Sequence, residues 1–433
     1  MSTALAADSE RGTFRALRHR DFRLWIIGLL LSSIGTWMQI TAQDWTVLTI
    51  LTDEDASSLA LVIALQTVPQ LLLLPVAGYV TDRFSRRRVL AVTQVWMACA
   101  AVALGVLVLT GVAQYWHVCL MAATLGIAQA FDAPARQTFV VDLLPPSGLS
   151  NGIALGGATF NLARLIGPAI AGVLIGQVGP GWIFLANGVS FSAMLIALSL
   201  MRLESAQPRP RPESGLKSML SGISYVVHHQ DIRILVLLVF LVLGCVGAAM
   251  NLLVISTATM VFDVGAEAFG LLTSFMAVGS VIGALFVAGR REPKLKFLLG
   301  SISLIGVSLW VASAMPTFVA FACVMPVLGF GLIASLATCN AAVQVRTDPA
   351  IRGRVMGVYI AAWMAGSPVG ALVFGAIVDG AGARAALAAA GGVTLAAAAG
   401  AAVLFGLRRT GRPGADASTD PSTSALDPRE ERA

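Results

Sequence analysis

Long apolar runs separated by short polar segments make up most of the chain. A run of ~20 residues at ~1.5 Å per residue covers the ~30 Å hydrocarbon core of a bilayer. The runs are continuous rather than alternating, and backbone in lipid must satisfy its hydrogen bonds within a helix. We therefore predict an all-α membrane protein with twelve transmembrane helices. The predicted spans are 24–51, 59–80, 89–111, 116–139, 151–176, 182–202, 233–257, 268–289, 297–315, 317–340, 355–378 and 385–407.

Composition supports this prediction and excludes several other classes. Of 433 residues, 57% are hydrophobic and only 12% are charged, whereas a soluble protein carries about 25% charged residues. The mean hydropathy of +0.82 is typical of a polytopic membrane protein. The five cysteines lie in apolar runs without metal-ligand spacing, so we expect no disulfide and no metal site. The net charge of +6 follows the loops, as described next, and does not indicate a nucleic-acid partner.

Basic and acidic residues alternate between successive loops. If the N-terminus is cytoplasmic, the cytoplasmic loops hold nearly all of the Lys and Arg residues, and Arg384 is the exception among the outer loops. Lys and Arg favour the cytoplasmic side of a membrane, so we predict a multi-pass protein of the plasma (inner) membrane with both termini cytoplasmic. The basic positions fall in 83–88, 136, 202–233, 290–296, 346–354 and 408–412, and the outer acids are Asp53, Glu54, Asp55, Asp263 and Glu267.

The polar segments also divide the chain into units. A Pro- and Arg-rich spacer at 206–212 is followed by apolar residues at helical spacing, which indicates an amphipathic helix on the membrane surface; an irregular polar linker is the alternative. The tail is rich in Pro, Ser, Thr and Asp and is predicted to be disordered. The predicted units are a cytoplasmic segment (1–23), an N-terminal six-helix bundle (24–203), a cytoplasmic linker with the amphipathic helix (204–232), a C-terminal six-helix bundle (233–407) and the tail (408–433).

The hairpin between the second and third spans holds an acid within a cluster of arginines. Orientation alone would explain the arginines, and a plain basic loop is the simpler interpretation. The spacing nevertheless resembles the signature G-x-x-x-D-R-x-G-R-R/K of the major facilitator superfamily, with Ser85 in place of the second Gly. The matching residues are Gly78, Asp82, Arg83, Arg86 and Arg87.

This resemblance implies an architecture and a role for the hairpin. The superfamily has two parallel six-helix repeats related by pseudo-two-fold symmetry, with the substrate site between them near the midplane. Its Gly lets helices approach, and its Asp faces the N-terminus of the eleventh helix, where a helix dipole favours a carboxylate. Two Gly/Pro segments, around Pro168 and Pro368, echo each other in the two halves.

The fifth span contains a Gly-Pro segment. Pro168 removes a backbone hydrogen bond and can kink the helix, while Gly167 and Gly172 permit close packing. The segment partly resembles the superfamily's exporter motif G-x-x-x-G-P-x-x-G-G. A packing kink with no bearing on transport direction is the alternative.

Charged and amide residues inside spans are candidates for the transport pathway. Arg164 lies about halfway along the fifth span, where a charge costs at least ~2.5–3.5 kcal/mol. Asp44 lies in the outer part of the first span, and we hypothesise that it shares a cavity with Arg164 and exchanges protons. An interfacial Asp44 near the headgroups is the alternative. Further candidates for the cavity lining are Gln39, Gln43, Asn161 and Asn251.

A second charged group lies at the inner end of the fourth span. Asp132 and Arg136 are four residues apart and can pair on one helix face, and Asp142 follows. The resemblance places such an acid near the loop arginines, so we expect Asp132 or Asp142 close to Arg83. An unlinked, solvated pair is the alternative.

Finer similarities lie before the first span, after the fourth, on the fifth and before the eleventh (17–25, 132–137, 161–168 and 352–357). They resemble the superfamily branch of siderophore exporters and multidrug efflux pumps. We therefore predict a secondary transporter that exports a small amphipathic drug or siderophore in exchange for protons. Because no nucleotide-binding loop G-x-x-x-x-G-K-S/T is present, the proton gradient is the expected energy source, with no cofactor. An importer and a non-transporting receptor on the same fold are the alternatives; no catalytic constellation suggests an enzyme, and a monomer is expected.

Overall fold

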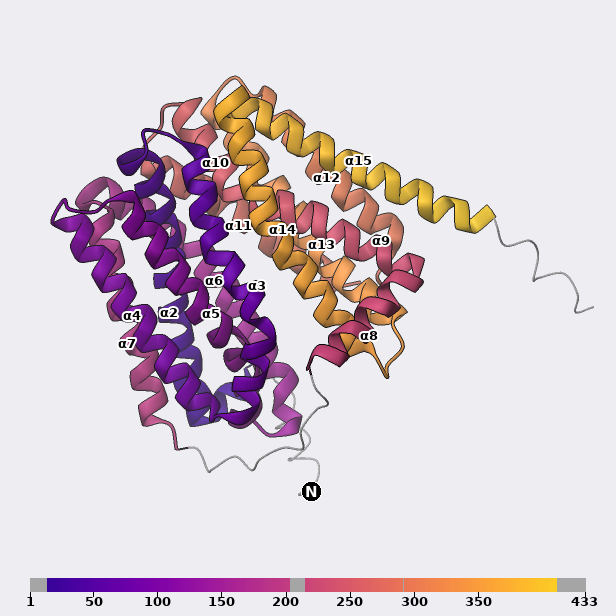
Figure 1. The fold of residues 1–433 in the computed structure, drawn as a ribbon, viewed down its shortest axis with the longest axis horizontal. Coiled ribbons are helices and arrows are strands. Elements are labelled where there is room, and N and C mark those ends of the chain that lie inside the picture. Colours follow the sequence, from indigo (N-terminus) through magenta and orange to yellow (C-terminus); the bar gives the residue numbers. More distant parts are fainter. Residues whose placement is uncertain (1–13, 203–214, 291, 411–433) are drawn as a thin grey trace, which may run out of the picture.

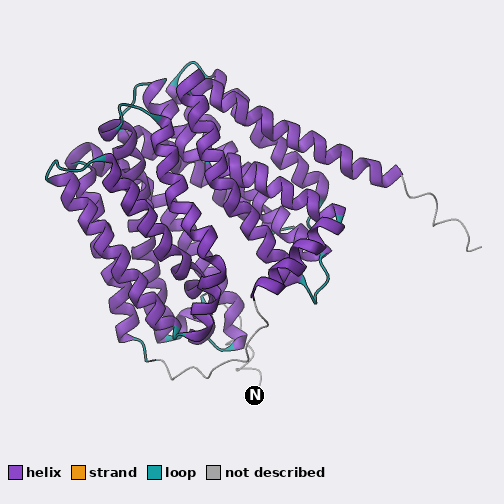
Figure 2. Ribbon diagram, in the orientation of Figure 1, coloured by secondary structure: helices purple, strands orange, loops and turns teal. Residues whose placement is uncertain are grey.

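The computed structural model of the protein describes residues 14–202, 215–290 and 292–410, and helices dominate these ranges (Figures 1 and 2). Within them, twelve helical spans are long and apolar enough to cross a membrane, as predicted. The N-terminal spans are α2 (Arg20–Trp45, continued by a π-helical segment, Thr46–Leu51), α3 (Ala56–Arg83), α4 (Arg86–Leu109), α5 (Tyr115–Leu143), α6 (Pro146–Val178) and α7 (Pro180–Leu200). The C-terminal spans are α9 (Gln230–Leu238) joined through a π-helical segment (Val239–Val246) to α10 (Met250–Met260), then α11 (Ala266–Ala288), α12 (Leu295–Ala314), α13 (Phe318–Arg346), α14 (Arg352–Ala381) and α15 (Ala383–Thr410).

Most helices extend a few residues past the apolar runs that predicted them. The start of α3 shows why: Asp55 precedes the apolar run at Leu59, and its carboxylate accepts a hydrogen bond from the Ser57 amide at 3.1 Å. Such a cap satisfies the free N–H groups of the first turn outside the hydrocarbon core. Hydropathy therefore located the helices, and at α3 a polar cap sets where the helix begins.

The helices form two bundles with matching packing. In the first bundle α2 packs on α6 and α7, α3 on α5, and α4 on α5 and α7. In the second, the π-helical part of the seventh span packs on α14, α11 on α13, and α12 on α13 and α15. The same pattern of neighbours six spans apart is what two repeats related by a pseudo-two-fold axis produce, as the sequence predicted.

Two helix pairs join the bundles. α3 packs on α14 and α6 packs on α11, while α10 adds smaller contacts to α2 and α3. We call the end of the molecule that holds the loops around Asp53–Asp55, Asp263 and Asp379 the acidic end, and the end that holds the hairpin 83–88 and the loop before Arg352 the basic end. Figure 1 shows the bundles together at the top and diverging toward the bottom.

The predicted amphipathic helix is present as α8 (Gly215–His228), at the lower end in Figure 1. It packs on α14 and touches α3. Arg354 donates a hydrogen bond to the Ser221 hydroxyl at 3.1 Å. Leu220 and Val227 remain exposed, which fits a helix that lies along a membrane surface. The Pro-rich spacer, the N-terminal segment before residue 14 and the tail after 410 lie outside the described residues.

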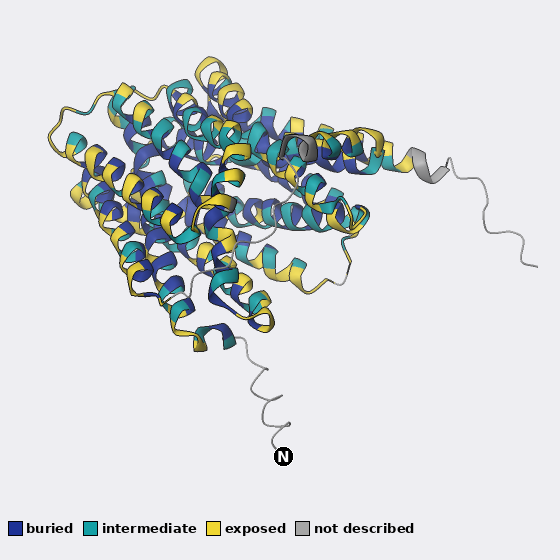
Figure 3. Ribbon diagram, turned by 60° about the horizontal axis from the view of Figure 1, so that its bottom comes forward, coloured by how far each residue is buried: buried dark blue, intermediate teal, exposed yellow. Residues whose placement is uncertain are grey.

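The outer surface of the bundles is apolar. Exposed positions follow the outward side of the helices (Figure 3), and large hydrophobic residues such as Leu72, Val189 and Leu285 are among the most exposed. A water-soluble protein rarely exposes so much contiguous apolar surface. The arrangement is the one required of helices that face lipid.

Candidate transport pathway

The pair α3 and α14 shows how the bundles diverge. Ala60 and Gly78 lie eighteen residues apart on α3, and Gly357 and Gly375 are spaced identically on α14, so each pair is separated by five helical turns and shares a face. A Cβ built on Gly375 would lie 2.8 Å from the Cβ of Ala60, whereas one built on Gly78 or Gly357 would meet no atom within 4 Å. The helices are therefore in contact near the acidic end and apart near the basic end.

The pair α6 and α11 forms the second junction. A Cβ on Gly172 would lie 2.7 Å from the Ala266 carbonyl oxygen, and one on Gly270 would lie 2.5 Å from the Pro168 carbonyl oxygen. Ser274 donates a hydrogen bond to the Leu165 carbonyl at 3.1 Å. Pro168 and Gly172 therefore belong to the junction between bundles.

Gly167, the third residue predicted from the Gly-Pro segment, faces a different neighbour. A Cβ there would lie 2.6 Å from the Cβ of Trp37, so Gly167 lets α6 approach α2 within the first bundle. The segment thus serves two packing interfaces at once.

Arg164 lies one turn before Pro168, beside the closed junction. Its guanidinium carbon is 5.6 Å from the centre of the Trp37 ring, and Trp37 makes an edge contact with Phe160 at 5.7 Å. A cation over an aromatic face is stabilised by the ring quadrupole. The structure thus places a cation and two aromatic rings together on α2 and α6.

Asp44 is buried, with 3% of its surface exposed. It lies two helical turns beyond Trp37 on the same face of α2. Neither Asp44 nor Arg164 forms a hydrogen bond or ion pair with a described residue. Arg164 lies over the Trp37 ring instead, and it forms no direct ion pair with Asp44 in this state. Asp44 is thus covered by protein, and its role in proton exchange stays a prediction.

A polar network lies inside the first bundle. Asn187 donates to the Gln39 side-chain oxygen at 2.6 Å, and the Ser190 hydroxyl donates to Asn187 at 2.8 Å. Gln39 and Asn187 line a small cavity, and Gln43 and Gln66 line it as well. Because Gln39 is satisfied inside the bundle, it orders the interior of the first bundle rather than lining a space between bundles.

The two predicted asparagines have different settings. Asn161 is half-buried and donates to the Gly157 carbonyl of its own helix at 3.0 Å. Asn251 is half-buried and follows the break between the π-helical segment and α10. Irregular backbone inside a membrane is tolerated where it is covered by protein or lines a water-filled space.

The predicted pair of Asp132 and Arg136 is present, with a contact of 2.7 Å. Asp132 is also buried and accepts from Thr93 at 2.9 Å and from Gln94 at 2.8 Å. The pair is therefore part of a buried network that ties α5 to α4, and the alternative of a solvated pair is wrong.

The loop arginines have other partners than expected. Arg86, not Arg83, pairs with Asp142 at 2.6 Å, and Arg83 bonds the Tyr79 hydroxyl on its own helix. Arg87 donates to the Ser199 carbonyl at 3.2 Å. An acid does bond a loop arginine, as the resemblance implied, but the partner of Asp142 is Arg86 and not Arg83, because Arg86 begins α4 next to Asp142 while Arg83 ends α3 and is exposed. The side chain of Asp82 lies outside the described residues, so its docking stays a prediction.

Sequence reasoning missed three polar residues, Gln94, Asn187 and Asp379. The two amide residues lie within apolar runs, where a single polar residue does not indicate whether its side chain forms a buried hydrogen bond. Asp379 accepts hydrogen bonds from the Ala56 amide at 2.9 Å and the Ser57 amide at 2.8 Å, and also binds the Ser57 hydroxyl. The segment Gly375-x-x-x-Asp379 repeats the spacing of Gly78-x-x-x-Asp82 and could have revealed it.

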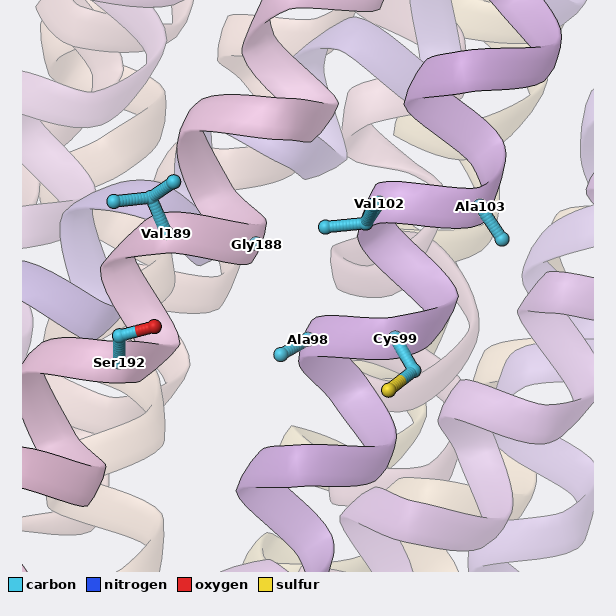
Figure 4. A pocket seen from close by; sticks show the side chains of 7 residues that line it. All are labelled: Ala98, Cys99, Val102, Ala103, Gly188, Val189 and Ser192. Carbon is cyan, nitrogen blue, oxygen red and sulfur yellow. The ribbon is translucent and has the colours of Figure 1, made fainter.

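A shallow apolar groove lies elsewhere, between α4 and α7 (Figure 4). It sits away from both junctions, on helices that pack within the first bundle, and Val189 is largely exposed there. We therefore do not include it in the pathway. The groove is lined by Ala98, Cys99, Val102, Ala103, Gly188, Val189 and Ser192. Across the described residues, no three His, Cys, Asp or Glu side chains gather as a metal site.

Residues 11–429 match the transmembrane secretion effector family. The chain belongs to this family, a branch of the major facilitator superfamily. It is 26% identical to the multidrug efflux pump Tap of Mycolicibacterium fortuitum, over 83% of this chain and 89% of that protein. It is 25% identical to the enterobactin exporter EntS of Shigella boydii, over 70% and 73% of the two chains.

Solved structures agree on the fold. A bacterial homologue of the human lysosomal transporter Spinster, crystallised inward-facing and unoccupied, superposes with a TM-score of 0.66 at 15% identity, covering 90% of this chain and 97% of its own. A POT family transporter gives 0.70 at 12% identity, covering 91% and 97%. At these identities the likeness establishes the fold alone. The family and the relatives are transporters, so this chain is a membrane transport protein and not an enzyme.

Proposed function

We propose that this transmembrane secretion effector exports a small amphipathic compound, a drug or a siderophore, in exchange for protons by alternating access. The observation that carries the proposal is the divergence of α3 and α14 from contact at Ala60 and Gly375 to separation at Gly78 and Gly357. Packed bundles switch between discrete arrangements rather than deforming continuously. Relatives described as a multidrug efflux pump and an enterobactin exporter support the outward direction.

The orientation in the plasma membrane follows from the charges. The basic end carries the arginine hairpin, and Lys and Arg favour the cytoplasmic side. In this proposal both termini are cytoplasmic, and the structure is an inward-facing state, open toward the cytoplasm and closed toward the outside. One chain supplies both bundles around the pathway, so a monomer suffices.

Asp44 is the proposed proton carrier. A charged side chain without a partner at membrane depth costs at least ~2.5–3.5 kcal/mol, and Asp44 is buried without a described partner in this state. In the outward-open state the carboxyl would be in water and take up a proton from the outside, and the neutral form would avoid that cost while buried. Export then requires that Asp44 release this proton to the cytoplasm before the next outward opening. The proton gradient would then drive export with no nucleotide or other cofactor.

The cluster of Arg164, Trp37 and Phe160 is the proposed substrate contact. Phe160 is 49% exposed, and the Arg164 guanidinium lies near the Trp37 face without an acid partner. Aromatic and anionic parts of a ligand would both find partners there. This chemistry suits a catecholate better than a lipophilic cation.

Inverted membrane vesicles from a host lacking its own efflux pumps test the proposal. The probes are a triscatecholate siderophore and ethidium, and the vesicle interior is made acidic. An exporter accumulates probe inside, and nigericin abolishes the accumulation by collapsing the pH gradient. Accumulation only in right-side-out vesicles would show import, and probe binding without flux in either orientation would show a receptor-like protein. Either result would overturn the proposal.

A further inference from the structure

Asp379 joins the two bundles at the acidic end. It lies in the last turn of α14, and its carboxylate accepts hydrogen bonds from the first two amides of α3, Ala56 and Ser57, at 2.9 and 2.8 Å. The Ser57 hydroxyl also donates to it. An acid at a helix N-terminus is stabilised both by the free N–H groups and by the helix dipole.

The same sequence spacing recurs at the basic end of this helix pair, with the roles of α3 and α14 exchanged. α3 ends with Gly78-x-x-x-Asp82 and α14 ends with Gly375-x-x-x-Asp379. The two helices run in opposite directions, so the C-terminal end of each lies at the same end of the molecule as the N-terminus of the other. In this state only the acidic end is in contact, and a Cβ on Gly78 would meet nothing within 4 Å.

We propose that Asp379 is a gating residue that closes the acidic end by capping α3, in alternation with the cap on α14 that the superfamily resemblance already implies for Asp82. The proposal deepens the alternating access described above and rests on it. Each latch combines a small residue that permits contact with a carboxylate one turn later that holds it.

The surroundings of Asp379 make this latch reversible. Asp55 accepts from the same Ser57 amide at 3.1 Å and binds the Ser58 hydroxyl at 2.5 Å. When Asp379 withdraws, Asp55 still accepts from the Ser57 amide, so one of the two capped amides of α3 keeps an acceptor and the Ala56 amide is released. Two carboxylates that share one donor also repel each other, which limits the strength of the closed state.

Other charged groups near this end have separate contacts. Arg384 donates to the Ser313 carbonyl at 3.5 Å and lies 5.9 Å from the centre of the Phe262 ring. Glu267, near Gly176 on the other junction, has no hydrogen bond with a described residue. Removal of Glu267 therefore provides a control for loss of one negative charge at this end.

At the basic end the start of α14 lacks a side-chain cap. Ile351 occupies the N-cap position and offers no acceptor, in contrast to Asp55 at the start of α3. A carboxylate from the opposite bundle would supply what is missing. This difference predicts that the Asp82 latch contributes more to its closed state than the Asp379 latch does.

Spin-label distance measurements test the proposal on the full-length protein in nanodiscs, with the five native cysteines replaced by alanine. The acidic-end pair is Val112→Cys with Val319→Cys, and the basic-end pair is Ser150→Cys with Val345→Cys. These positions are exposed and lie in opposite bundles. No substrate or gradient is applied, so the result does not depend on what the protein transports or in which direction.

Asp379→Ala is expected to lengthen the acidic-end distance and shorten the basic-end distance, with about a tenfold change in the ratio of the two states. Asp379→Asn should shift the ratio less in the same direction, and Asp82→Asn should shift it in the opposite direction. Size-exclusion chromatography confirms that each variant is folded, and Asp379→Asn serves if the alanine variant is not.

Two results would overturn the proposal. One is an unchanged distance distribution in both Asp379 variants. The other is an equal shift in Glu267→Gln, because the effect would then report negative charge at the acidic end rather than the capping bonds of Asp379. An export failure in vesicles with the expected distance shifts would reject the proposed function and leave the latch intact.

Discussion

Arg164 and Asp44 carry charge into membrane spans without an ion pair to offset it in this state. Such residues are expensive and mark a pathway or a proton relay. Arg164 lies on α6 beside the α6–α11 junction, and Asp44 lies on α2, which packs on α6.

Replacing Arg164 separates its charge from its shape. Arg164→Leu is expected to lower siderophore transport at least ~10-fold, because the ligand loses its charged hydrogen-bond donor. Arg164→Lys should retain part of the activity, since an ammonium keeps the charge but cannot stack on Trp37 as a planar group. Initial rates in the inverted vesicles measure both. Equal activity of all three proteins would exclude Arg164 from substrate binding.

Replacing Asp44 tests proton coupling. Asp44→Asn is expected to carry substrate down its own gradient while failing to accumulate it when the vesicle interior is acidic. The amide is close in shape but cannot exchange a proton. Gln43→Asn, at the neighbouring position, is the control for packing changes. Full proton-driven accumulation by Asp44→Asn would remove Asp44 from the coupling step.

Asp55 gives a pH dependence that can be worked out in sign. The hydrogen bond from the Ser58 hydroxyl is the main cause that lowers the pKa of the Asp55 carboxyl below its usual 3.8. Hydrogen bonds from the backbone amides at the start of α3 lower the pKa further. A lowered pKa in the folded state contributes stability above the unfolded value and loses it as pH falls through the folded value. Asp55→Asn should therefore lower Tm equally at pH 7 and pH 5, and the difference should shrink only below about pH 4. A difference that vanished already at pH 5 would contradict this assignment.

Sequence spacing revealed the Asp132–Arg136 pair, because i,i+4 residues share a helix face, but not its place in a network. Gln94 comes from another helix, and no local pattern could bring it to Asp132. Asp379 was hidden for a different reason: it lies just past the end of the predicted eleventh span, where an acid is unremarkable. Its meaning depends on the start of α3, more than three hundred residues earlier.

At the scale of elements, α3 and α14 are helices of similar length that carry small residues at the same spacing: Ala60 and Gly78 on α3, and Gly357 and Gly375 on α14. A helix pair of this kind can pack closely at one end or at the other with little change in itself. The apolar runs predicted the two helices, and the superfamily resemblance predicted their bundles. Which end is in contact depends on packing between bundles, which no single span determines.

Two glycine substitutions should act in opposite directions. Gly375→Leu meets Ala60 and the Ala56 carbonyl in this state, so it should disfavour contact at the acidic end and shorten the basic-end distance. Gly78→Leu meets no atom in this state. It should obstruct only the state in which the basic end is closed, so the fraction of molecules with a long basic-end distance should rise. Spin-label measurements on the basic-end pair check both. Shifts of the same sign would show that the two glycines do not serve alternate contacts.

At the scale of the molecule, the two bundles repeat one packing pattern and meet along two helix pairs. In the proposed alternating access, that symmetry would allow contacts at one end to be exchanged for equivalent contacts at the other. The continuous apolar runs were enough to predict the twelve spans. The sequence patterns could not predict which conformational state the structure shows, because one sequence must be compatible with both the inward-facing and the outward-facing state.

Single-molecule fluorescence on the acidic-end and basic-end pairs, in nanodiscs with and without the triscatecholate probe, tests alternating access most directly. We predict that each molecule switches between two states and that the probe changes their ratio. When the fraction of molecules with a short basic-end distance rises, the fraction with a long acidic-end distance should rise by a comparable amount. Simultaneous lengthening of both distances, or a single fixed state under every condition, would contradict the account.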